Sequence, residues 1–169
     1  MPQLGANSQP VTDPISTRAA KIEDLAEVLR MEQSAPSAAH WVPDHYKNRI
    51  QSQPQGACFL VAESLSGTTD KKNIVAFLCA RIAAGEWEIE NVVVGENYRR
   101  QGMGARLMES LIQRWDGSAG ASLLLEVRAS NTAARALYER YGLREAGRRQ
   151  AYYRDPLEDA ILYTRRRGE

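Results

Sequence analysis

Val92-Val93-Val94 is an apolar run, and Arg99-Arg100-Gln101-Gly102-Met103-Gly104 follows it after a short polar connection. The run has the β-branched composition of a strand, whereas the residues after Gly104 repeat apolar side chains at helical spacing. Glycines let a backbone approach a ligand closely, a first helical turn exposes unpaired N–H groups, and arginines add positive charge. The segment therefore fits a phosphate-binding turn, and by spacing alone it fits equally well an ordinary turn with solvated arginines.

Two common nucleotide-binding motifs are excluded by the same segment. The dinucleotide fingerprint G-x-G-x-x-G fails because Leu107 occupies the place of its third glycine. The phosphate-binding P-loop fails because no Gly-Lys-Ser/Thr follows the glycines. A Rossmann fold and a nucleotide hydrolase are both excluded as interpretations.

Apolar periodicity and turn residues predict the elements on both sides of this segment. Before it we expect a strand, two helices and three strands, with a turn at 66–70 between the first two of these three strands: 15–19, 21–32, 44–53, 58–63, 74–83 and 87–94. After it we expect a helix, a buried strand, a helix that Asn131 caps and Gly142 ends, and two last strands: 104–115, 123–127, 131–141, 143–148 and 159–165.

This order of elements predicts an α/β (α+β) fold. The sheet should be mixed and mostly antiparallel, with one parallel step, and flanked by helices. Residues 1–14 are rich in Gln, Asn, Ser, Pro and Gly and are expected to form a flexible arm. Residues 15–169 are expected to form one domain, for which a hydrophobic fraction of 43% supplies a core.

The charge pattern gives little support to a polyanionic partner. The formal net charge is +1, so no global field would hold the protein on nucleic acid or an anionic membrane. A nucleic-acid role would need a local patch, and the best patches are Arg148-Arg149 and Arg165-Arg166-Arg167. The second lies at a terminus, where arginines are usually solvated, so neither patch is taken as a binding site. No run of about 18 apolar residues and no secretory signal is present, so we expect a cytoplasmic protein without membrane or direct nucleic-acid partners.

The cysteines and histidines do not form a metal or redox motif. Cys58 and Cys79 lie in separate apolar runs and are expected to be buried, inert thiols. His40 and His45 flank Trp41 without a cluster of other ligand residues. No metal is therefore expected.

The residues from Arg99 onward resemble a known family. Arg99-Arg100-Gln101-Gly102-Met103-Gly104 satisfies the Q/R-x-x-G-x-G/A signature of the GNAT acetyltransferase superfamily. Leu125 to Asn131, Ala136 to Gly142 and Arg148 to Tyr153 are similar to its RimI-like branch, the bacterial enzymes that acetylate the N-terminus of a small-subunit ribosomal protein. The resemblance spans roughly residues 15–164.

The resemblance implies a site for acetyl-CoA as acetyl donor. Backbone amides of the glycine loop would hold the pyrophosphate, and the preceding strand would pair with the pantetheine arm. Asn131 would cap its helix and also touch the cofactor. The cofactor-binding residues implied are Val92, Val93, Val94, Arg99, Arg100, Gln101, Gly102, Met103, Gly104, Ala105, Asn131 and Tyr138.

Acetyl transfer to an amine requires a base, an acid and a donor to the oxyanion. Glu126 ends an apolar strand, where a carboxylate should be partnered or functional, and the resemblance makes it the general base. Its alternative role is a salt bridge to Arg128 or Arg135. Tyr138 would be a core aromatic by spacing, and the resemblance makes it the general acid. A backbone N–H, that of Val94, would polarise the oxyanion.

Acidic and aromatic residues are candidates for the acceptor site. Glu86, Glu88 and Glu90 alternate along one strand, which gives either a site for a cationic acceptor or a solvated face, and Glu88 or Glu90 could replace Glu126 as base. By the resemblance, Tyr152 and Tyr153 would cover the first residues of the acceptor.

We therefore expect an acetyl-CoA-dependent N-acetyltransferase that acts on the α-amine of a protein N-terminus, by analogy a ribosomal one. Its partners would be acetyl-CoA and that peptide, and it would be a monomer or weak dimer. Two alternatives stay open: an acetyltransferase acting on a small amine or a lysine, and a catalytically silent acyl-CoA-binding module.

Overall fold

The computed structural model describes residues 14–36, 40–65 and 72–168. The arm expected before Ile15 and the turn expected at 66–70 lie, apart from Pro14, outside these residues. The elements are β1 (Ile15–Ala19), α1 (Leu25–Gln33), α2 (Pro43–Gln51), β2 (Ala57–Leu65), β3 (Lys72–Ala83), β4 (Glu86–Val94), α3 (Met103–Asp116), β5 (Ser122–Arg128), α4 (Thr132–Arg140), β6 (Arg144–Arg154) and β7 (Leu157–Arg166), with 3-10 turns at Ile22–Asp24 and Glu96–Tyr98.

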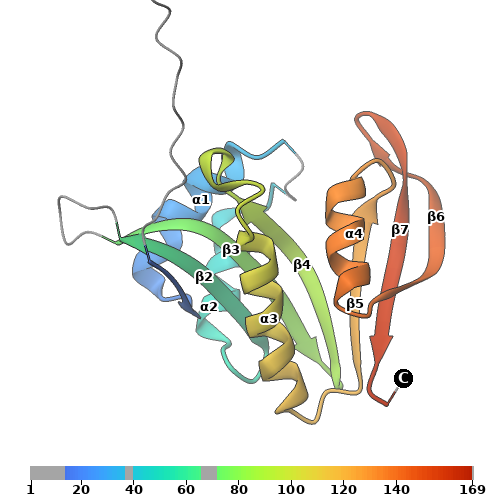
Figure 1. The fold of residues 1–169 in the computed structure, drawn as a ribbon, viewed down its shortest axis with the longest axis horizontal. Helices are drawn as coiled ribbons and strands as arrows, with labels where there is room; N and C mark the ends of the chain where they lie inside the picture. Colours follow the sequence, from blue (N-terminus) through green and yellow to red (C-terminus); the bar gives the residue numbers. More distant parts are fainter. Residues whose placement is uncertain (1–13, 37–39, 66–71, 169) are drawn as a thin grey trace, which may run out of the picture.

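The strands form one sheet in the order β1-β2-β3-β4-β5-β7-β6 (Figure 1). Only β4 and β5 pair in parallel, and every other neighbouring pair in this sheet is antiparallel. The predicted fold class and its single parallel step are confirmed. The crossover through α3 is what allows this parallel step.

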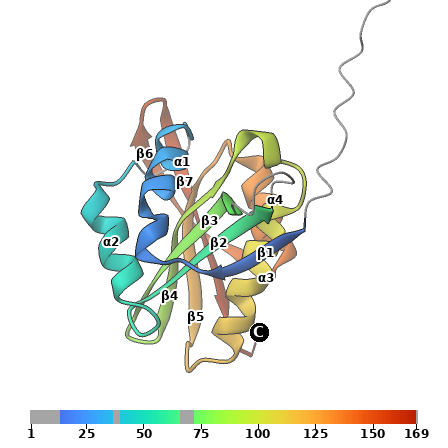
Figure 2. The ribbon, with the colours of Figure 1, turned by 90° about the vertical axis from the view of Figure 1, so that its left-hand side faces the viewer.

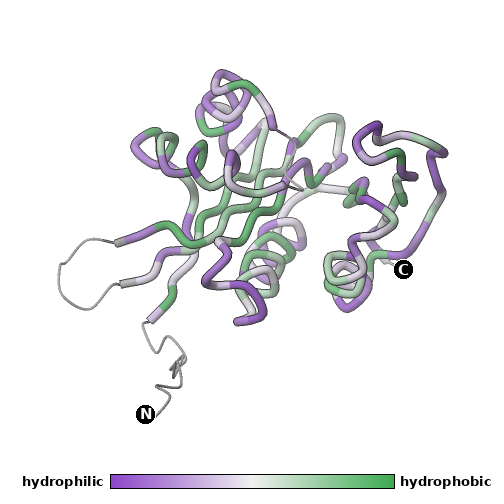
Figure 3. Tube along the Cα trace, turned by 90° about the horizontal axis from the view of Figure 1, so that it is seen from above, coloured by the Kyte–Doolittle hydropathy of each residue, from purple (hydrophilic) through white to green (hydrophobic). Residues whose placement is uncertain are grey.

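Helices cover both faces of the sheet (Figure 2). Helices α1 and α2 lie on one face, and α3 and α4 lie on the other. Two clusters of buried apolar side chains correspond to these two layers, and β2 and β3 contribute alternate residues to each. Figure 3 shows the apolar residues concentrated along the central strands.

Helix α3 follows from its apolar spacing. Its buried side chains recur at three- and four-residue intervals, as predicted: Met103, Leu107, Met108, Leu111 and Trp115. Gly102 precedes it with a φ of 79°, and Gly117 follows its last residue. The helix therefore begins at the glycine loop, with its first turn directed at the same end of the sheet as the end of β4.

The C-terminal hairpin differs from the prediction. The strand expected at 143–148 extends to Arg154, and its register against β7 shifts between Arg149 and Tyr153, where Ala151 has a φ of 49°. The strand was predicted too short because nearly all of its residues are exposed, so it shows no apolar alternation.

The structure tests what was expected of the two cysteines and of a membrane-spanning helix. Cys58 and Cys79 are buried, as expected, and burial raises the pKa of Cys58 to about 11. Among the described residues, no helix combines the length and the apolar character that crossing a membrane requires.

Candidate active site

Strands β4 and β5 pair over only part of their length. Their parallel register runs from Glu86–Ser122 to Ile89–Leu125, after which the strands diverge (Figure 1). A register shift between β3 and β4 lies at the same level, where Cys79 pairs with Asn91 and Ala80 with Ile89. Past this point, the edge of β4 that faces β5 has no partner strand among the described residues.

The open edge of β4 exposes backbone hydrogen-bonding groups. The N–H of Gly95 donates to the carbonyl of Val75 in β3 at 2.9 Å. Because successive N–H groups of a strand point to opposite edges, the N–H of Val94 points away from β3, toward β5. Val92 shares this direction, so both residues can pair with an extended ligand that lies between the two strands.

The glycine loop lies at the end of this open edge. Arg100 and Gly102 have φ values of 59° and 79°, and a Cβ built on Gly102 would meet nothing within 4 Å. Gln101 donates to the carbonyl of Asn97 at 2.7 Å, which closes the turn. The side chain of Arg99 donates to the carbonyl of Val94 at 3.4 Å, so the loop is tied to the strand.

The first turn of α3 is suited to an anion. No side chain caps this helix and no acidic residue lies in its first turn, so its N–H groups and its positive dipole end are available. Met103 is buried in the core, and a Cβ on Gly104 would approach Leu137 of α4 to 3.0 Å. Gly104 thus lets α4 pack against the start of α3. Ala105 receives a hydrogen bond of 3.0 Å on its carbonyl from the Tyr141 hydroxyl.

Glu126 is the first residue of β5 beyond its pairing with β4. Its Oε1 lies 2.8 Å from Nε of Arg149, and its side chain is 25% exposed. The alternative salt bridges to Arg128 and Arg135 were wrong. Arg128 pairs with Glu158 at 3.3 Å and Arg135 with Glu145 at 3.6 Å. Glu126 therefore keeps access to solvent while an ion pair orients its carboxylate.

Tyr138 of α4 belongs to the core cluster on the face of the sheet that α3 and α4 cover. It is buried, with its ring 6.4 Å from that of Tyr163. Burial, with a smaller contribution from Tyr153, raises the pKa of Tyr138 to about 12. Its hydroxyl has no hydrogen-bond partner in the part of the chain that the structure describes. A phenol in this state keeps its proton at neutral pH and has it available for donation.

The two tyrosines of the β6–β7 hairpin lie beside Glu126. The charge of Glu126 and a hydrogen bond to it raise the pKa of Tyr152, whose side chain is exposed. Burial raises the pKa of Tyr153, and the Glu126 charge adds to this. The guanidinium of Arg128 stacks over the Tyr153 ring at 4.1 Å. Tyr152 and Tyr153 are therefore both close enough to Glu126 for its charge to raise the pKa of their hydroxyls.

The acidic face of β4 is occupied by arginines. Glu88 lies 2.5 Å from Arg81 of β3. Glu90 accepts two hydrogen bonds of 2.7 Å from Arg49 of α2, and its side chain is only 10% exposed. The structure thus places Glu90 in a partly buried ion pair between helix and sheet, whereas Glu126 is beside the divergence. Glu86 is exposed at the start of the strand.

Asn131 caps α4, as expected. Its side-chain oxygen accepts from the N–H of Ala134 at 3.2 Å. The preceding residue, Ser130, is held by a hydrogen bond from its N–H to Glu158. The cap and the hairpin are therefore connected at the end of β5.

The sequence did not predict that Arg149 pairs with Glu126 or that Arg128 stacks over the ring of Tyr153. Arg149 was considered only as part of a basic patch, yet it contacts Glu126 directly and lies 5.5 Å over the Tyr152 ring. The sequence feature that could have pointed to Arg149 is its position three residues before the adjacent tyrosines Tyr152 and Tyr153. No group of three or more metal-ligating side chains occurs among the described residues.

Comparison with known proteins agrees with this geometry. Residues 22–143 match a family model described as the acetyltransferase (GNAT) family. The [ribosomal protein bS18]-alanine N-acetyltransferase of Escherichia coli K12 is 43% identical over 96 residues, which are 56% of this chain and 65% of that protein. The enzyme of the same name from Haemophilus ducreyi is 31% identical over 143 residues, 83% of this chain and 92% of that protein.

Solved structures show the same architecture. The crystal structure of the ribosomal-protein-S18-alanine N-acetyltransferase from Escherichia coli superposes with a TM-score of 0.74 and 30% identity, covering 89% of this chain and 92% of that one. Arabidopsis thaliana NAA60 in complex with acetyl-CoA has a TM-score of 0.83 at 17% identity, with coverage of 92% and 100%, and shows the shared fold. The chain therefore belongs to the GNAT acetyltransferase family, in its RimI-like branch.

Proposed function

We propose that the protein transfers an acetyl group from acetyl-CoA to the α-amine of a protein N-terminus, that of a small-subunit ribosomal protein such as bS18. One observation carries this proposal. At the point where β4 and β5 diverge, Glu126 of β5 flanks the open edge of β4, and Tyr138 of α4 supplies a buried phenol that keeps its proton at neutral pH.

The residues present fit acetyl-CoA. The loop from Arg99 to Ala105 offers helix N-terminal amides, a glycine in the left-handed conformation and no acidic side chain, which suits a pyrophosphate. The open edge of Val92 to Val94 can pair with the amide groups of the pantetheine arm. Acetyl-CoA supplies the activated thioester, and the protein supplies proton transfers and positioning.

Glu126 removes a proton from the acceptor amine, directly or through one water molecule. An α-amine has a pKa near ~8 and a lysine amine near ~10.4, so an N-terminus is more readily deprotonated at neutral pH. The N–H of Val94 donates to the carbonyl oxygen as negative charge develops on it. The new C–N bond forms as the C–S bond breaks, and Tyr138 gives its proton to the departing thiolate.

The choice of acceptor is supported by the relatives and by the hairpin. The similar proteins from Escherichia coli and Haemophilus ducreyi are named as acting on ribosomal protein bS18. Tyr152 and Tyr153 lie next to Glu126, where they can cover the first residues of a peptide. An exposed aromatic beside the base suits a peptide better than a small amine, which has no further residues to contact.

Mass spectrometry of two peptides tests the proposal. One peptide carries the N-terminal sequence of bS18 with a free α-amine and no lysine. The other has the same sequence with a blocked N-terminus and one added lysine. We expect acetylation of the first at least about 100-fold faster than of the second. Equal rates, or transfer only to polyamines, would favour a small-amine or lysine acetyltransferase, and no transfer to any amine would favour a silent acyl-CoA-binding module.

A further inference from the structure

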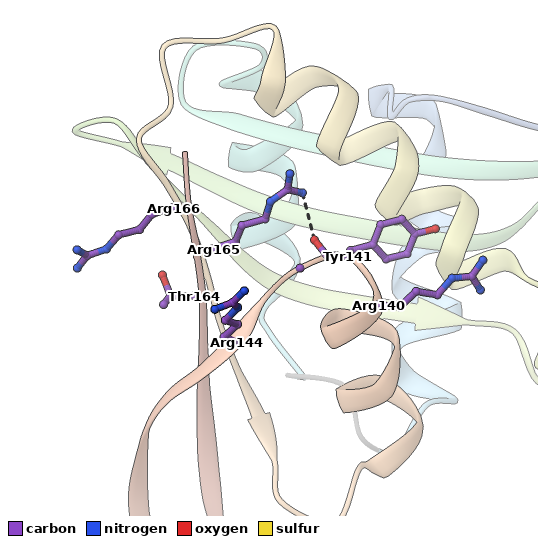
Figure 4. A pocket seen from close by; sticks show the side chains of 7 residues that line it. Arg140, Tyr141, Arg144, Thr164, Arg165 and Arg166 are labelled. Carbon is purple, nitrogen blue, oxygen red and sulfur yellow. Dashed lines mark hydrogen bonds between the residues drawn. The ribbon is translucent and has the colours of Figure 1, made fainter. Parts of the chain in front are cut away.

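A pocket lined by arginines lies where α4 ends, β6 begins and β7 ends (Figure 4). Its volume is about 370 Å³. No acidic residue lines it. Its lining residues are Arg140, Tyr141, Gly142, Arg144, Thr164, Arg165 and Arg166.

These arginines differ from most others in their lack of carboxylate partners. Within the described ranges, Arg140, Arg144 and Arg166 have no ion pair, and all three are exposed. Arg165 is held by a hydrogen bond of 3.1 Å to the carbonyl of Tyr141 and by stacking over Trp115 at 5.1 Å. Of the fourteen arginines outside the pocket, eight pair with carboxylates: Arg18, Arg30, Arg49, Arg81, Arg128, Arg135, Arg148 and Arg149. The others, which have no ion pair within the described ranges either, do not gather around one pocket.

Four guanidinium groups at one pocket repel one another, because arginine stays charged at every physiological pH. A bound polyanion would remove this repulsion, and guanidinium groups match phosphate oxygens in geometry. The net charge of +1 conceals this patch, because it averages over all faces of the molecule.

The arrangement indicates an extended ligand. Figure 4 shows the side chains of Arg140 and Arg166 directed to opposite sides of the pocket, with Arg144 between them. Side chains that point in different directions suit the successive phosphates of an extended backbone better than a single small anion. None of the exposed large apolar side chains, Ile22, Val42, Tyr152 and Leu157, lines the pocket, which argues against insertion into a membrane.

We infer that this pocket binds the phosphodiester backbone of single-stranded RNA. The contact is electrostatic and independent of base sequence. It does not depend on acetyl transfer, so the inference stands or falls separately from the proposed function.

Fluorescence anisotropy with a labelled 12-nucleotide RNA tests this inference. The full chain is titrated at about 50 mM salt with saturating CoA present, so that the glycine loop is occupied. The pocket variant carries Arg144→Gln and Arg166→Gln. The control carries Arg30→Gln and Arg114→Gln, which remove the same charge from exposed positions on α1 and α3.

The pocket variant should bind RNA at least about 10-fold more weakly than the wild type, and its slope of log K against log salt should fall by about 0.7 per arginine removed. The control should stay within about two-fold of the wild type, and both variants should acetylate a free peptide normally. Equal RNA affinity of pocket variant and control, or no binding by the wild type, would overturn the inference. Displacement of RNA by a poly-glutamate peptide as effective as by unlabelled RNA would also overturn it.

Discussion

The Nε atom of Arg149 in β6 lies 2.8 Å from Oε1 of Glu126 in β5. This ion pair holds the carboxylate at the point where β4 and β5 diverge, and it connects the proposed base to the hairpin that carries Tyr152 and Tyr153. Because Gln has nearly the shape of Glu, Glu126→Gln can keep a hydrogen bond to Arg149. The substitution therefore tests proton transfer by the carboxylate without disturbing the fold around it.

Glu126→Gln should lower kcat by about 10²- to 10⁴-fold, since a general base contributes on this scale. Acetyl-CoA affinity, measured by calorimetry, should change by less than about two-fold, because the carboxylate does not contact the glycine loop. Glu145→Gln is the matched control: it also removes a carboxylate that pairs with arginines, Arg135 of α4 and Arg148 of β6. A kcat of Glu126→Gln equal to that of this control would remove Glu126 as the base.

Tyr138 should make the stability of the protein depend on alkaline pH. Its pKa is about 12 in the folded protein and about 10 in an unfolded chain. Between these values the folded state binds more protons than the unfolded state, so stability falls as pH rises from about 10 to about 12. Below about pH 10 this group does not change stability with pH.

Urea unfolding at pH 9 and pH 12 measures this effect. The wild type should lose about 2 to 3 kcal/mol more than Tyr138→Phe over this interval, since the variant lacks the ionisable group. At pH 7.5 the same variant should keep its acetyl-CoA affinity and lose at least about 100-fold in kcat. An unchanged kcat would leave Tyr138 as a core aromatic.

The sequence predicts the element order and the fold class because helix and strand periodicity are local properties of the chain. It does not predict that Glu90 pairs with an arginine, because its partner Arg49 lies 41 residues away on α2. It shows the basic run that contains Arg165, but not the arginine pocket, because Arg140 and Arg144 come to it from two other elements. Glu126 and Tyr138 were found through a motif, while the burial that raises the pKa of Tyr138 requires the packed structure.

Position 102 should require glycine because of its left-handed backbone conformation, and not because a larger side chain would clash with its surroundings. Its φ is +79°, and a Cβ there would meet nothing within 4 Å. Gly102→Ala should therefore cost about 1 to 2 kcal/mol of left-handed strain or force the loop to rearrange, with weaker acetyl-CoA binding. Gly147→Ala, in β6, also has open space and does not have a positive φ. Thermal unfolding and CoA titration should show it unaffected, and equal behaviour of the two variants would contradict the conformational requirement.

Tyr152 should determine how well a peptide acceptor binds. Its ring is exposed beside Glu126, which raises the pKa of its hydroxyl by charge and by a hydrogen bond. Tyr152→Ala should raise KM for the peptide by about 10-fold, since an aromatic contact of this kind is worth about 1 to 2 kcal/mol, and should leave KM for acetyl-CoA unchanged. Tyr152→Phe keeps the ring and removes the hydroxyl, so it should recover most of the peptide affinity. If instead Tyr152→Phe behaves like Tyr152→Ala, with a lower kcat and an unchanged peptide KM, Tyr152 acts through its hydrogen bond to Glu126 and not as part of the acceptor site.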